Sequence, residues 1–331
     1  PFRIKTQVIY TRQLLPKLKY IMTSNKHSHA SSNFMTLNQL GVIRVEGEDA
    51  QSMLQNLLTN DVAALAINQS HLSGLCNPKG RLLALFLLLR RSDGYLLILP
   101  KAMCAGLQQR LSMYILRSKV TITDASDSMT CMGLTLATDG IINSRQLPDA
   151  DYQATEQDGS ILIKYPGDQS RFLCVGSPSQ LTAFTAELLE QQWHMATESD
   201  WELLDIEAGL PMIQPETKEQ FTTQQVNLDL VNGVSFKKGC YPGQEIVARM
   251  YYLGTPSRRM FQAEVHTANP INVGDEVTSD KGNVAGHVVR VQQKNDGSVL
   301  MLLSLKLSAV DLGIFVHNDE QVNILDSIIA E

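Results

Sequence analysis

The order of the expected elements constrains the fold of this chain more than any other feature. Hydrophobic residues recur at helical spacing after Asp49, whereas short apolar runs bounded by Gly, Pro and Asn turns indicate strands. The expected elements are, in order, a strand at 41–45, a helix from 49, strands at 71–76, 81–89 and 95–99, a helix at 101–116 and a strand at 119–123. This order predicts an α+β layer in which helices cover one face of a largely antiparallel sheet.

The pattern recurs in a weaker form in the next part of the chain. We expect strands at 130–137, 160–165 and 171–175, a helix at 178–193, and a second helix from a capping box at Ser199-Asp200-Trp201-Glu202 to Gly209. Ser177 is the expected N-cap of the first of these helices, with Pro178 in its first turn. The repetition predicts two pseudo-duplicated α+β subdomains, at about 36–125 and 126–255, with a cleft between them.

Beyond residue 256 the pattern changes to short strands only. They are expected at 260–267, 271–278, 284–293, 298–305 and 321–325. Several short strands in about seventy residues are typical of a small antiparallel barrel. The third predicted domain therefore covers residues 256–331.

Charge is distributed unevenly along the chain. Residues 1–35 carry six basic side chains and no acidic one, which leaves 22 basic and 34 acidic side chains for the other residues. We interpret residues 1–35 as a basic leader outside the fold, either a transit-peptide-like segment or a non-native N-terminus. The acidic remainder is a poor general binder of phosphate backbones, and no apolar run is long enough for a membrane helix. We expect a soluble protein that contacts neither nucleic acid nor membrane directly.

Five cysteines are scattered along the 331 residues, with no Cys-x-x-Cys pair and no cysteine–histidine cluster. This usage indicates a reducing compartment, and it makes a zinc site or a self-contained iron–sulfur site unlikely to be encoded here, so we predict no metal site. The chain also lacks the glycine-rich and catalytic motifs of Rossmann, P-loop, zincin and α/β-hydrolase proteins. Trp193 and Trp201 occur at helical spacings that we interpret as core.

The sequence GVSFKKGCYPGQE at 233–245 is the strongest candidate for a functional site. It sets Cys240 between Gly239 and Gly243, which permit backbone conformations and close approaches that a Cβ would forbid. Lys237 and Lys238 place positive charge where it would favour a thiolate over a thiol. The alternative is a buried structural cysteine, but the polar neighbours argue against an apolar environment.

Two weaker signals accompany this motif. A basic patch with Glu245 as its single acid combines five side chains, Lys237, Lys238, Arg249, Arg258 and Arg259. It suits a small polyanionic ligand or is simply a solvated basic face. Glu207 is expected near the inner side of its helix, where a carboxylate could accept hydrogen bonds from an amino-pyrimidine ring or pair with a buried arginine.

The segment GVSFKKGCYPGQEIVAR closely resembles the K-G-C-Y-x-G-Q-E motif of the YgfZ family of folate-binding proteins, relatives of the T-protein aminomethyltransferase of the glycine cleavage system. Other segments that resemble the family from about residue 37 to the C-terminus are GEDAQSMLQNLLTNDV, CNPKGR, DIEAGLPMI and FTTQQVNL. The cysteine motif is highly specific, and the others are individually weak. Departures are Thr223 in place of a usual proline, Asn232 in place of a usual glycine, and Pro242 at the variable position.

The resemblance implies a T-protein-like folate-binding fold of two α+β subdomains plus a C-terminal β-barrel, with tetrahydrofolate or a derivative bound centrally. It implies a role in the assembly or repair of iron–sulfur enzymes, notably those that thiomethylate tRNA. Cys240 would supply the reactive thiol beside the folate cavity and Lys238 would favour its thiolate form. The residues that we expect to bind the cofactor are Glu207, Asn227, Tyr241, Gln244, Glu245 and Arg249.

One difference from the T-protein bears on whether the chain is an enzyme. T-proteins carry an acidic pair after the first hairpin turn, and this chain has Leu83 and Ala84 at those places in our alignment. Without that carboxylate, acid–base assistance of aminomethyl transfer loses its main group. We therefore expect an accessory protein whose partners are folate and iron–sulfur enzymes such as tRNA methylthiotransferases. The alternative is a folate-dependent aminomethyl- or methyltransferase, and the expected location is a bacterial cytoplasm or, alternatively, the mitochondrial matrix.

Overall fold

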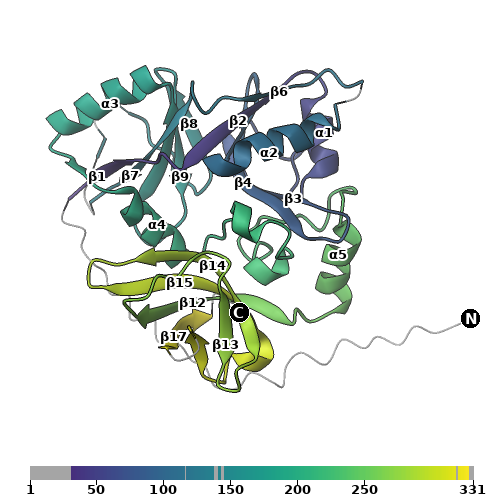
Figure 1. Ribbon diagram of the computed structural model, residues 1–331. Helices are drawn as coiled ribbons and strands as arrows, with labels where there is room; N and C mark the ends of the chain where they lie inside the picture. Colours follow the sequence, from purple (N-terminus) through teal and green to yellow (C-terminus); the bar gives the residue numbers. More distant parts are fainter. Residues whose placement is uncertain (1–30, 116, 138–140, 143–144, 318–319, 328–331) are drawn as a thin grey trace, which may run out of the picture.

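The first part of the chain forms an antiparallel sheet with two helices (Figure 1). The computed structural model describes residues 31–115, 117–137, 141–142, 145–317 and 320–327. The elements of this layer are β2 (Leu40–Glu46), α1 (Ala50–Leu57), β3 (Gln69–Cys76), β4 (Leu82–Arg91), β5 (Gly94–Pro100), α2 (Lys101–Ser112) and β6 (Thr121–Asp124). The predicted order is confirmed, and α2 ends at Ser112 rather than at residue 116.

The strands of this sheet are arranged in the order β3-β4-β5-β2-β6. Helix α1 buries Met53, Leu54 and Leu57 on one face, as the spacing of its apolar residues predicts. Helix α2 lies close to β2 because Gly41 has no side chain. A Cβ at Gly41 would lie 2.5 Å from Sγ of Cys104, so a larger residue would push the helix away from the sheet.

The second layer is a mixed sheet in the order β11-β1-β7-β10-β9-β8 with helices α3 and α4. Its elements are β1 (Asn33–Thr36), β7 (Thr130–Thr135), β8 (Ala154–Gln157), β9 (Ser160–Tyr165), β10 (Arg171–Gly176), α3 (Pro178–Glu190), β11 (His194–Met195) and α4 (Glu198–Glu207). The N-cap at Ser177 is confirmed, since its hydroxyl accepts a hydrogen bond from the Gln180 amide. The capping box of α4 consists of Thr197 and Asp200, so its predicted start at Ser199 was wrong.

Strand β1 crosses from the start of the described chain into this second sheet. It pairs with β7 in antiparallel register, Asn33 opposite Thr135, and with β11 in parallel register, Asn33 opposite His194. The expected leader at 1–35 is therefore corrected at its end, because residues 33–35 belong to the fold. Residues 1–30 lie outside the described part of the chain.

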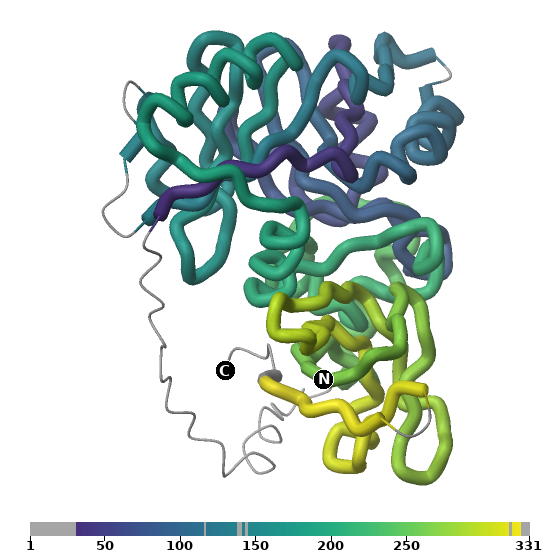
Figure 2. Tube along the Cα trace, turned by 60° about the vertical axis from the view of Figure 1, so that its left-hand side comes forward, coloured from purple at the N-terminus to yellow at the C-terminus, as the bar shows by residue number. Residues whose placement is uncertain are grey.

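The last part of the chain closes into the expected antiparallel barrel, in the order β12-β15-β14-β13-β16-β17 (Figure 2). Its strands are β12 (Arg258–His266), β13 (Glu276–Ser279), β14 (Val284–Gln293), β15 (Ser298–Lys306), β16 (Ile314–Val316) and β17 (Glu320–Ser327). Strand β13 is much shorter than the predicted 271–278, and β16 was not predicted. The interior consists of aliphatic side chains such as Val277, Met301 and Leu303.

The chain between α4 and the barrel returns to the first layer. It contains the short 3-10 helices η1 (Pro215–Thr217) and η2 (Gln224–Val226) and helix α5 (Gln244–Leu253). Thr222 forms an isolated bridge with Arg81, and the Ser235 amide donates to the Thr59 carbonyl. The predicted second subdomain, 126–255, thus ends with a segment that packs on the first one.

Among the described residues, no helix is both long enough and apolar enough to cross a lipid bilayer.

Candidate functional site

The cysteine loop, residues 239–243, packs against the turn that joins β3 to β4. Gly243 has a φ of +81°, and a Cβ there would lie 2.5 Å from the Asn77 carbonyl oxygen and 2.7 Å from Cα of Gly80. Only glycine allows both this conformation and this close backbone approach. A Cβ at Gly239 would meet nothing within 4 Å, so the expected steric role of this glycine is wrong. Two motifs far apart in the sequence, CNPKGR and KGCYPGQE, therefore form one contact.

Lys238 holds the start of this loop against the C-terminal end of α1. Its ammonium donates to the carbonyls of Gln55, Leu58 and Asn60 at 2.5, 2.6 and 3.0 Å. The same nitrogen lies 5.3 Å from the centroid of the Tyr241 ring. Burial lowers the pKa of Lys238 to about 8, and nearby Asp61 opposes this shift. The side chain thus serves as an anchor, and its expected effect on the Cys240 thiol stays a prediction.

Cys240 is the exposed cysteine of the chain, in agreement with the prediction from its polar neighbours. The other four, Cys76, Cys104, Cys131 and Cys174, are buried. Burial raises the pKa of Cys76 to about 12 and that of Cys104 to about 11. Thiols with such pKa values stay protonated near neutral pH and are poor nucleophiles. Accessible thiol chemistry is therefore concentrated at position 240.

The loop leads directly into helix α5, which carries three of the expected cofactor residues. Gln244 occupies the first position of the helix, and its side chain donates to the Gly239 carbonyl at 3.4 Å, so it helps to close the loop. Glu245 and Arg249 are exposed on the helix surface. Tyr241 is buried beneath Lys238, and burial raises the pKa of its hydroxyl. Gln244 thus contacts the cysteine loop, and Tyr241 is part of it.

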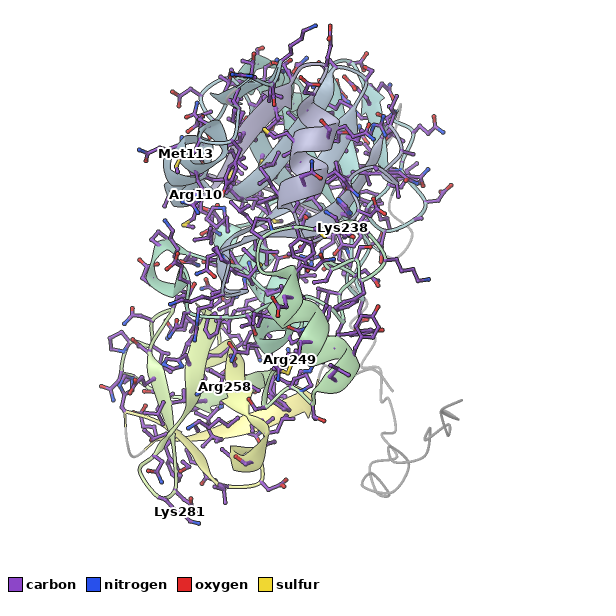
Figure 3. The ribbon with its side chains drawn as sticks, turned by 90° about the vertical axis from the view of Figure 1, so that its right-hand side faces the viewer. Arg110, Met113, Lys238, Arg249, Arg258 and Lys281 are labelled. Carbon is purple, nitrogen blue, oxygen red and sulfur yellow. The ribbon has the colours of Figure 1, made fainter. Side chains whose placement is uncertain are left out.

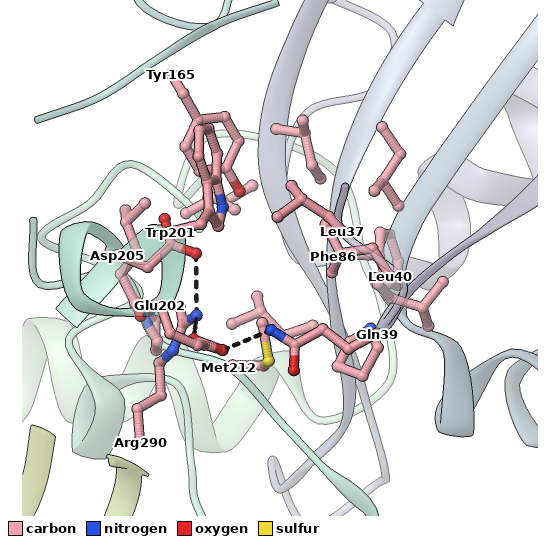
Figure 4. A pocket seen from close by; sticks show the side chains of 18 residues that line it. Leu37, Gln39, Leu40, Phe86, Tyr165, Trp201, Glu202, Asp205, Met212 and Arg290 are labelled. Atoms are coloured by element: carbon pink, nitrogen blue, oxygen red, sulfur yellow. Dashed lines mark hydrogen bonds and ion pairs between the residues drawn. The ribbon is translucent and has the colours of Figure 1, made fainter. Parts of the chain in front are cut away.

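A second candidate site is a central pocket where the first sheet, helix α4 and the barrel meet (Figure 4). Its walls combine aliphatic side chains of the first sheet with polar and aromatic side chains that include Tyr165, Trp201, Glu202, Asp205 and Arg290. The cavity has a volume of about 40 Å³, which is room for a few water molecules. The three units of the fold therefore converge on a small polar cavity.

Glu202, Asp205 and Arg290 form the polar side of this pocket, and Arg171, which does not line it, completes the buried ion cluster. Arg290 of β14 pairs with Glu202 and, at 2.9 Å, with Asp205 of α4, while Arg171 of β10 pairs with Asp205 at 2.7 Å. Burial alone would lower the pKa of Arg290, but the facing carboxylates more than offset this and raise it. Nε of Arg290 is buried and has no hydrogen-bond partner. Gln39 donates to Glu202 from the opposite wall at 3.3 Å (Figure 4).

The placement of Glu207 differs from the expectation. The inner face of α4 carries Trp201, Glu202, Asp205 and Ile206, and Glu207 lies on the exposed side of the helix. Each residue is rotated by about 100° from its neighbour, so Glu207 lies past the edge of the inner face that ends at Ile206. The buried carboxylates that pair with arginine are thus Glu202 and Asp205.

Asn227 is also placed differently from a ligand-binding residue. It is fully buried in a left-handed conformation after η2, with a φ of 53°. Its side-chain nitrogen donates to the Met260 carbonyl at 2.8 Å, and its side-chain oxygen accepts from the Met260 amide at 3.1 Å. Both ends of the carboxamide are therefore used to join this segment to β12.

None of the residues of the cysteine loop lines the central pocket, and the same holds for the six expected cofactor residues. Cys240 does not line this pocket, and its expected place beside a folate cavity stays a prediction. The residues that sequence reasoning missed are Trp201, Glu202, Asp205 and Arg290. Trp201 was interpreted as core, and its helical spacing does not distinguish a core residue from one that lines a buried cavity. Of these four residues, only Arg290 is noticeable in the sequence, because it is a single arginine within the apolar run Val288–Val291.

A larger hollow lies beside α2. Its volume is about 480 Å³, and its floor is formed by Leu75, Leu83, Met103 and Leu107. Arg110, Lys218 and Glu219 contribute polar groups at its rim. Its size is typical of ligand sites, but it lacks the aromatic ring faces and the buried carboxylates of the central pocket.

Comparisons with known proteins agree with this architecture. The family model described as the GCVT N-terminal domain matches residues 15–135. A crystal structure of the glycine cleavage system aminomethyltransferase T from Bartonella henselae superposes with a TM-score of 0.73, at 16% identity, and the match covers 91% of this chain and 86% of that one. At this identity the likeness concerns the fold, and it confirms the predicted T-protein-like arrangement.

Sequence relatives extend over most of the chain. The tRNA-modifying protein YgfZ of Colwellia psychrerythraea is 30% identical over 270 residues, which are 80% of this chain and 82% of that protein. The protein of the same name from Edwardsiella ictaluri is 31% identical over 280 residues, 82% of this chain and 84% of that protein. The chain belongs to the YgfZ family.

Proposed function

We propose that this protein is a folate-binding accessory protein for the assembly or repair of iron–sulfur enzymes, including enzymes that thiomethylate tRNA. In this proposal tetrahydrofolate or a derivative binds in the central pocket, and the thiol of Cys240 acts on the client enzyme. The relatives carry the name tRNA-modifying protein, which supports a connection to tRNA modification through such clients. Because these relatives are bacterial, we further propose that the protein acts in the bacterial cytoplasm.

The observation that carries the folate part is the chemistry of the central pocket. A pteridine ring is flat and carries both donors and acceptors on its edge. Trp201 and Tyr165 offer ring faces, Glu202 and Asp205 offer acceptors, and Arg290 offers a buried Nε–H with no other partner. The donor set thus fits the ring. The cavity volume of about 40 Å³ is too small for the ring, so we expect the side chains at the pocket wall to move apart on binding.

The thiol part rests on the cysteine loop. Cys240 is exposed, while Lys238 and Gly243 hold the loop on both sides through buried contacts with the first layer. A reactive group on a rigid support is suited to contact with a macromolecular client. Leu83 and Ala84 are buried and apolar in β4, which favours an accessory role over the alternative of an aminomethyl- or methyltransferase.

Tetrahydrofolate binding is tested by the thermal shift and by the fluorescence of Trp201. We expect tetrahydrofolate to raise the melting temperature of the protein and to change the tryptophan emission. Trp201→Leu should weaken binding by at least tenfold because it removes a ring face from the pocket. Trp193→Leu is the matched control, since Trp193 lies in the separate core beneath α3. No shift with the unmodified protein would refute the folate part.

The thiol is tested in cells that lack the native protein. We expect Cys240→Ala to fail to restore thiomethylated tRNA, while the wild-type chain restores it. Cys104→Ala is the matched control, because that thiol is buried between its own helix, α2, and β2. Full restoration by Cys240→Ala would refute the role of the thiol without affecting the folate part.

A further inference from the structure

Helix α5 directs an apolar stripe toward solvent. Val247 is the buried residue of this helix, whereas Ile246 is 40% exposed and Leu253 is 84% exposed. Ile246, Met250 and Leu253 are spaced at i, i+4 and i+7, which places them on one side of the helix. This spacing is typical of a helix face that packs against another surface. We call these three residues the α5 stripe.

Three aromatic rings, on the side of α5 opposite the stripe, are held in fixed positions. Phe236 and Tyr251 are stacked with their centroids 3.7 Å apart, and the ring of Tyr252 meets that of Tyr251 edge-on at 5.0 Å. The Tyr252 hydroxyl donates to the Phe236 carbonyl at 3.4 Å. Tyr251 and Tyr252 are nevertheless 53% and 63% exposed. Rigid, exposed aromatic side chains are typical anchors of protein–protein interfaces because they lose little conformational entropy on binding.

Positive charge surrounds this apolar surface. Lys237, Arg249 and Arg258 make no ion pair with any residue in the described ranges, and Glu245 is the single acid between 237 and 258. In Figure 3, Arg249 on α5 and Arg258 at the start of the barrel lie on the same face of the molecule. The chain as a whole carries a net charge of -6. A local basic and apolar surface on an acidic protein favours an acidic partner.

We propose that α5, exposed through the stripe on one side and through the tyrosine rings on the other, is together with the three cations a docking element for an acidic protein. The partner would be the client enzyme of the proposed function, so the identity of the partner rests on that proposal. Because Ile246 and Gly243 both pack against Gly80, the stripe begins beside the cysteine loop, and a partner on the stripe would lie close to Cys240. Docking would thus bring the client to the reactive group.

Two other occupants fit this surface less well. A second copy of the chain in a two-fold dimer would place the same cations of both copies against each other, which costs free energy. A single-stranded RNA would find stacking faces on the tyrosines, but the aliphatic side chains of Ile246 and Leu253 cannot stack with bases. Apolar side chains flanked by cations suit an acidic protein.

The test measures binding of a purified tRNA methylthiotransferase with its iron–sulfur clusters in place. The variant Arg249→Glu/Leu253→Glu changes two exposed side chains of α5. Its matched control is Lys281→Glu/Leu189→Glu, which makes the same charge change at exposed sites on the barrel and on α3. We expect the α5 variant to bind at least tenfold more weakly than the wild type and the control within twofold of it. Binding of the wild type should also weaken between 100 and 500 mM salt.

Three results would overturn the docking proposal. In the first, the wild-type protein does not bind the enzyme. In the second, the α5 variant binds it as tightly as the wild type does. In the third, the wild type binds tRNA or a second copy of itself and the α5 variant does not. The tetrahydrofolate shift and the labelling of Cys240 by a small thiol reagent are measured on the same samples. We expect both to be unchanged in the α5 variant. If tetrahydrofolate did not shift the melting temperature of the wild type, the folate part of the proposed function would be refuted separately, because the enzyme-binding assay does not depend on folate.

Discussion

At the scale of single residues, Gly243 and Lys238 determine where the thiol is held. The glycine brings the backbone of the cysteine loop against the turn at Asn77–Gly80, and the lysine joins the loop to the end of α1. Neither contact involves the cysteine itself. The position of the exposed thiol thus depends on two residues whose contacts are structural.

Replacing the two glycines of the loop by alanine should have very different effects on stability. Gly243→Ala forces a Cβ into the backbone of Asn77 and Gly80 at a positive φ, and we expect it to lower the free energy of unfolding by about 2 kcal/mol or more. Gly239→Ala places its methyl group in open space and should change stability by less than about 0.5 kcal/mol. Urea denaturation of both variants measures the difference. Equal stabilities would contradict the steric argument.

His71 should make the protein sensitive to mild acid. Burial, with a smaller contribution from Lys238, lowers its pKa to about 4, while the unfolded chain keeps about 6.5. The unfolded state therefore takes up the proton first, and stability that is present above pH 6.5 is lost as the pH falls toward 4. Between pH 7.5 and 5 this loss amounts to about 2 kcal/mol.

Urea denaturation at pH 7.5 and at pH 5 tests the role of His71. In His71→Gln the acid-induced loss of stability should shrink by about 2 kcal/mol, since the titrating group is gone. His194→Gln, at an exposed position, should leave the loss unchanged. The same pH dependence in His71→Gln as in the wild type would exclude this histidine as its source.

At the scale of elements, helix α1 depends on a side chain from a distant part of the chain. The helix has no basic residue in its last turn, and the carbonyls of Gln55 and Leu58 accept hydrogen bonds from Lys238. A cation at the C-terminal end also interacts favourably with the helix dipole. The end of α1 and the cysteine loop are therefore stabilised by the same ammonium group.

Lys238→Met should loosen both elements together. The variant leaves three buried carbonyls without their charged donor, which should cost about 2 kcal/mol. Hydrogen–deuterium exchange should rise at 53–60 and at 236–243 in the same variant. Lys237→Met removes an exposed neighbour and should leave both segments protected. Faster exchange at only one of the two segments would show that they are not coupled.

Element types were predictable where the sequence pattern is local. The β3–β4–β5 meander follows from its apolar runs and the turns between them, and α3 begins where Ser177 and Pro178 predict. Strand β1 could not be predicted because four residues carry little periodicity and its partners lie about a hundred residues away. The start of α4 was misplaced by two residues because Thr197 and Ser199 are both suitable caps, and only the hydrogen bonds identify Thr197.

At the scale of the whole molecule, Arg290 joins the barrel to the second layer. It reaches from β14 to Glu202 and Asp205 of α4 and donates to the Leu210 carbonyl at 3.0 Å. The charges are buried, so each depends on its partners for compensation. The same contacts form one wall of the central pocket.

Arg290→Met should destabilise the protein strongly and weaken tetrahydrofolate binding. Removing one member of a buried ion cluster leaves carboxylates uncompensated, and the expected cost is about 3 kcal/mol or more. Lys119→Met breaks an exposed ion pair with Glu48 and should cost less than about 1 kcal/mol. Chemical denaturation gives the stabilities and the thermal shift gives the folate effect. A small cost for Arg290→Met would show that solvent reaches the cluster.

The candidate site was predictable only in part. Cys240 stood out because glycine and lysine neighbours are a local signal, and its exposure is confirmed. The central pocket combines Arg290 with Trp201 and Glu202, which lie about ninety residues apart, and no spacing in the sequence connects them. Glu207 was predicted to face inward from its apolar neighbours, but the buried carboxylates of α4 are Glu202 and Asp205. Such contacts between separate units require the three-dimensional structure.

The crossing of β1 has a consequence for folding during synthesis. This strand leaves the ribosome before the whole first sheet, yet it pairs with Thr135 and its neighbours in β7 and with His194 in β11. The first layer can therefore assemble while β1 is still unpaired. Completion of the second layer requires the nascent chain to bring its earliest strand back to one of its later ones.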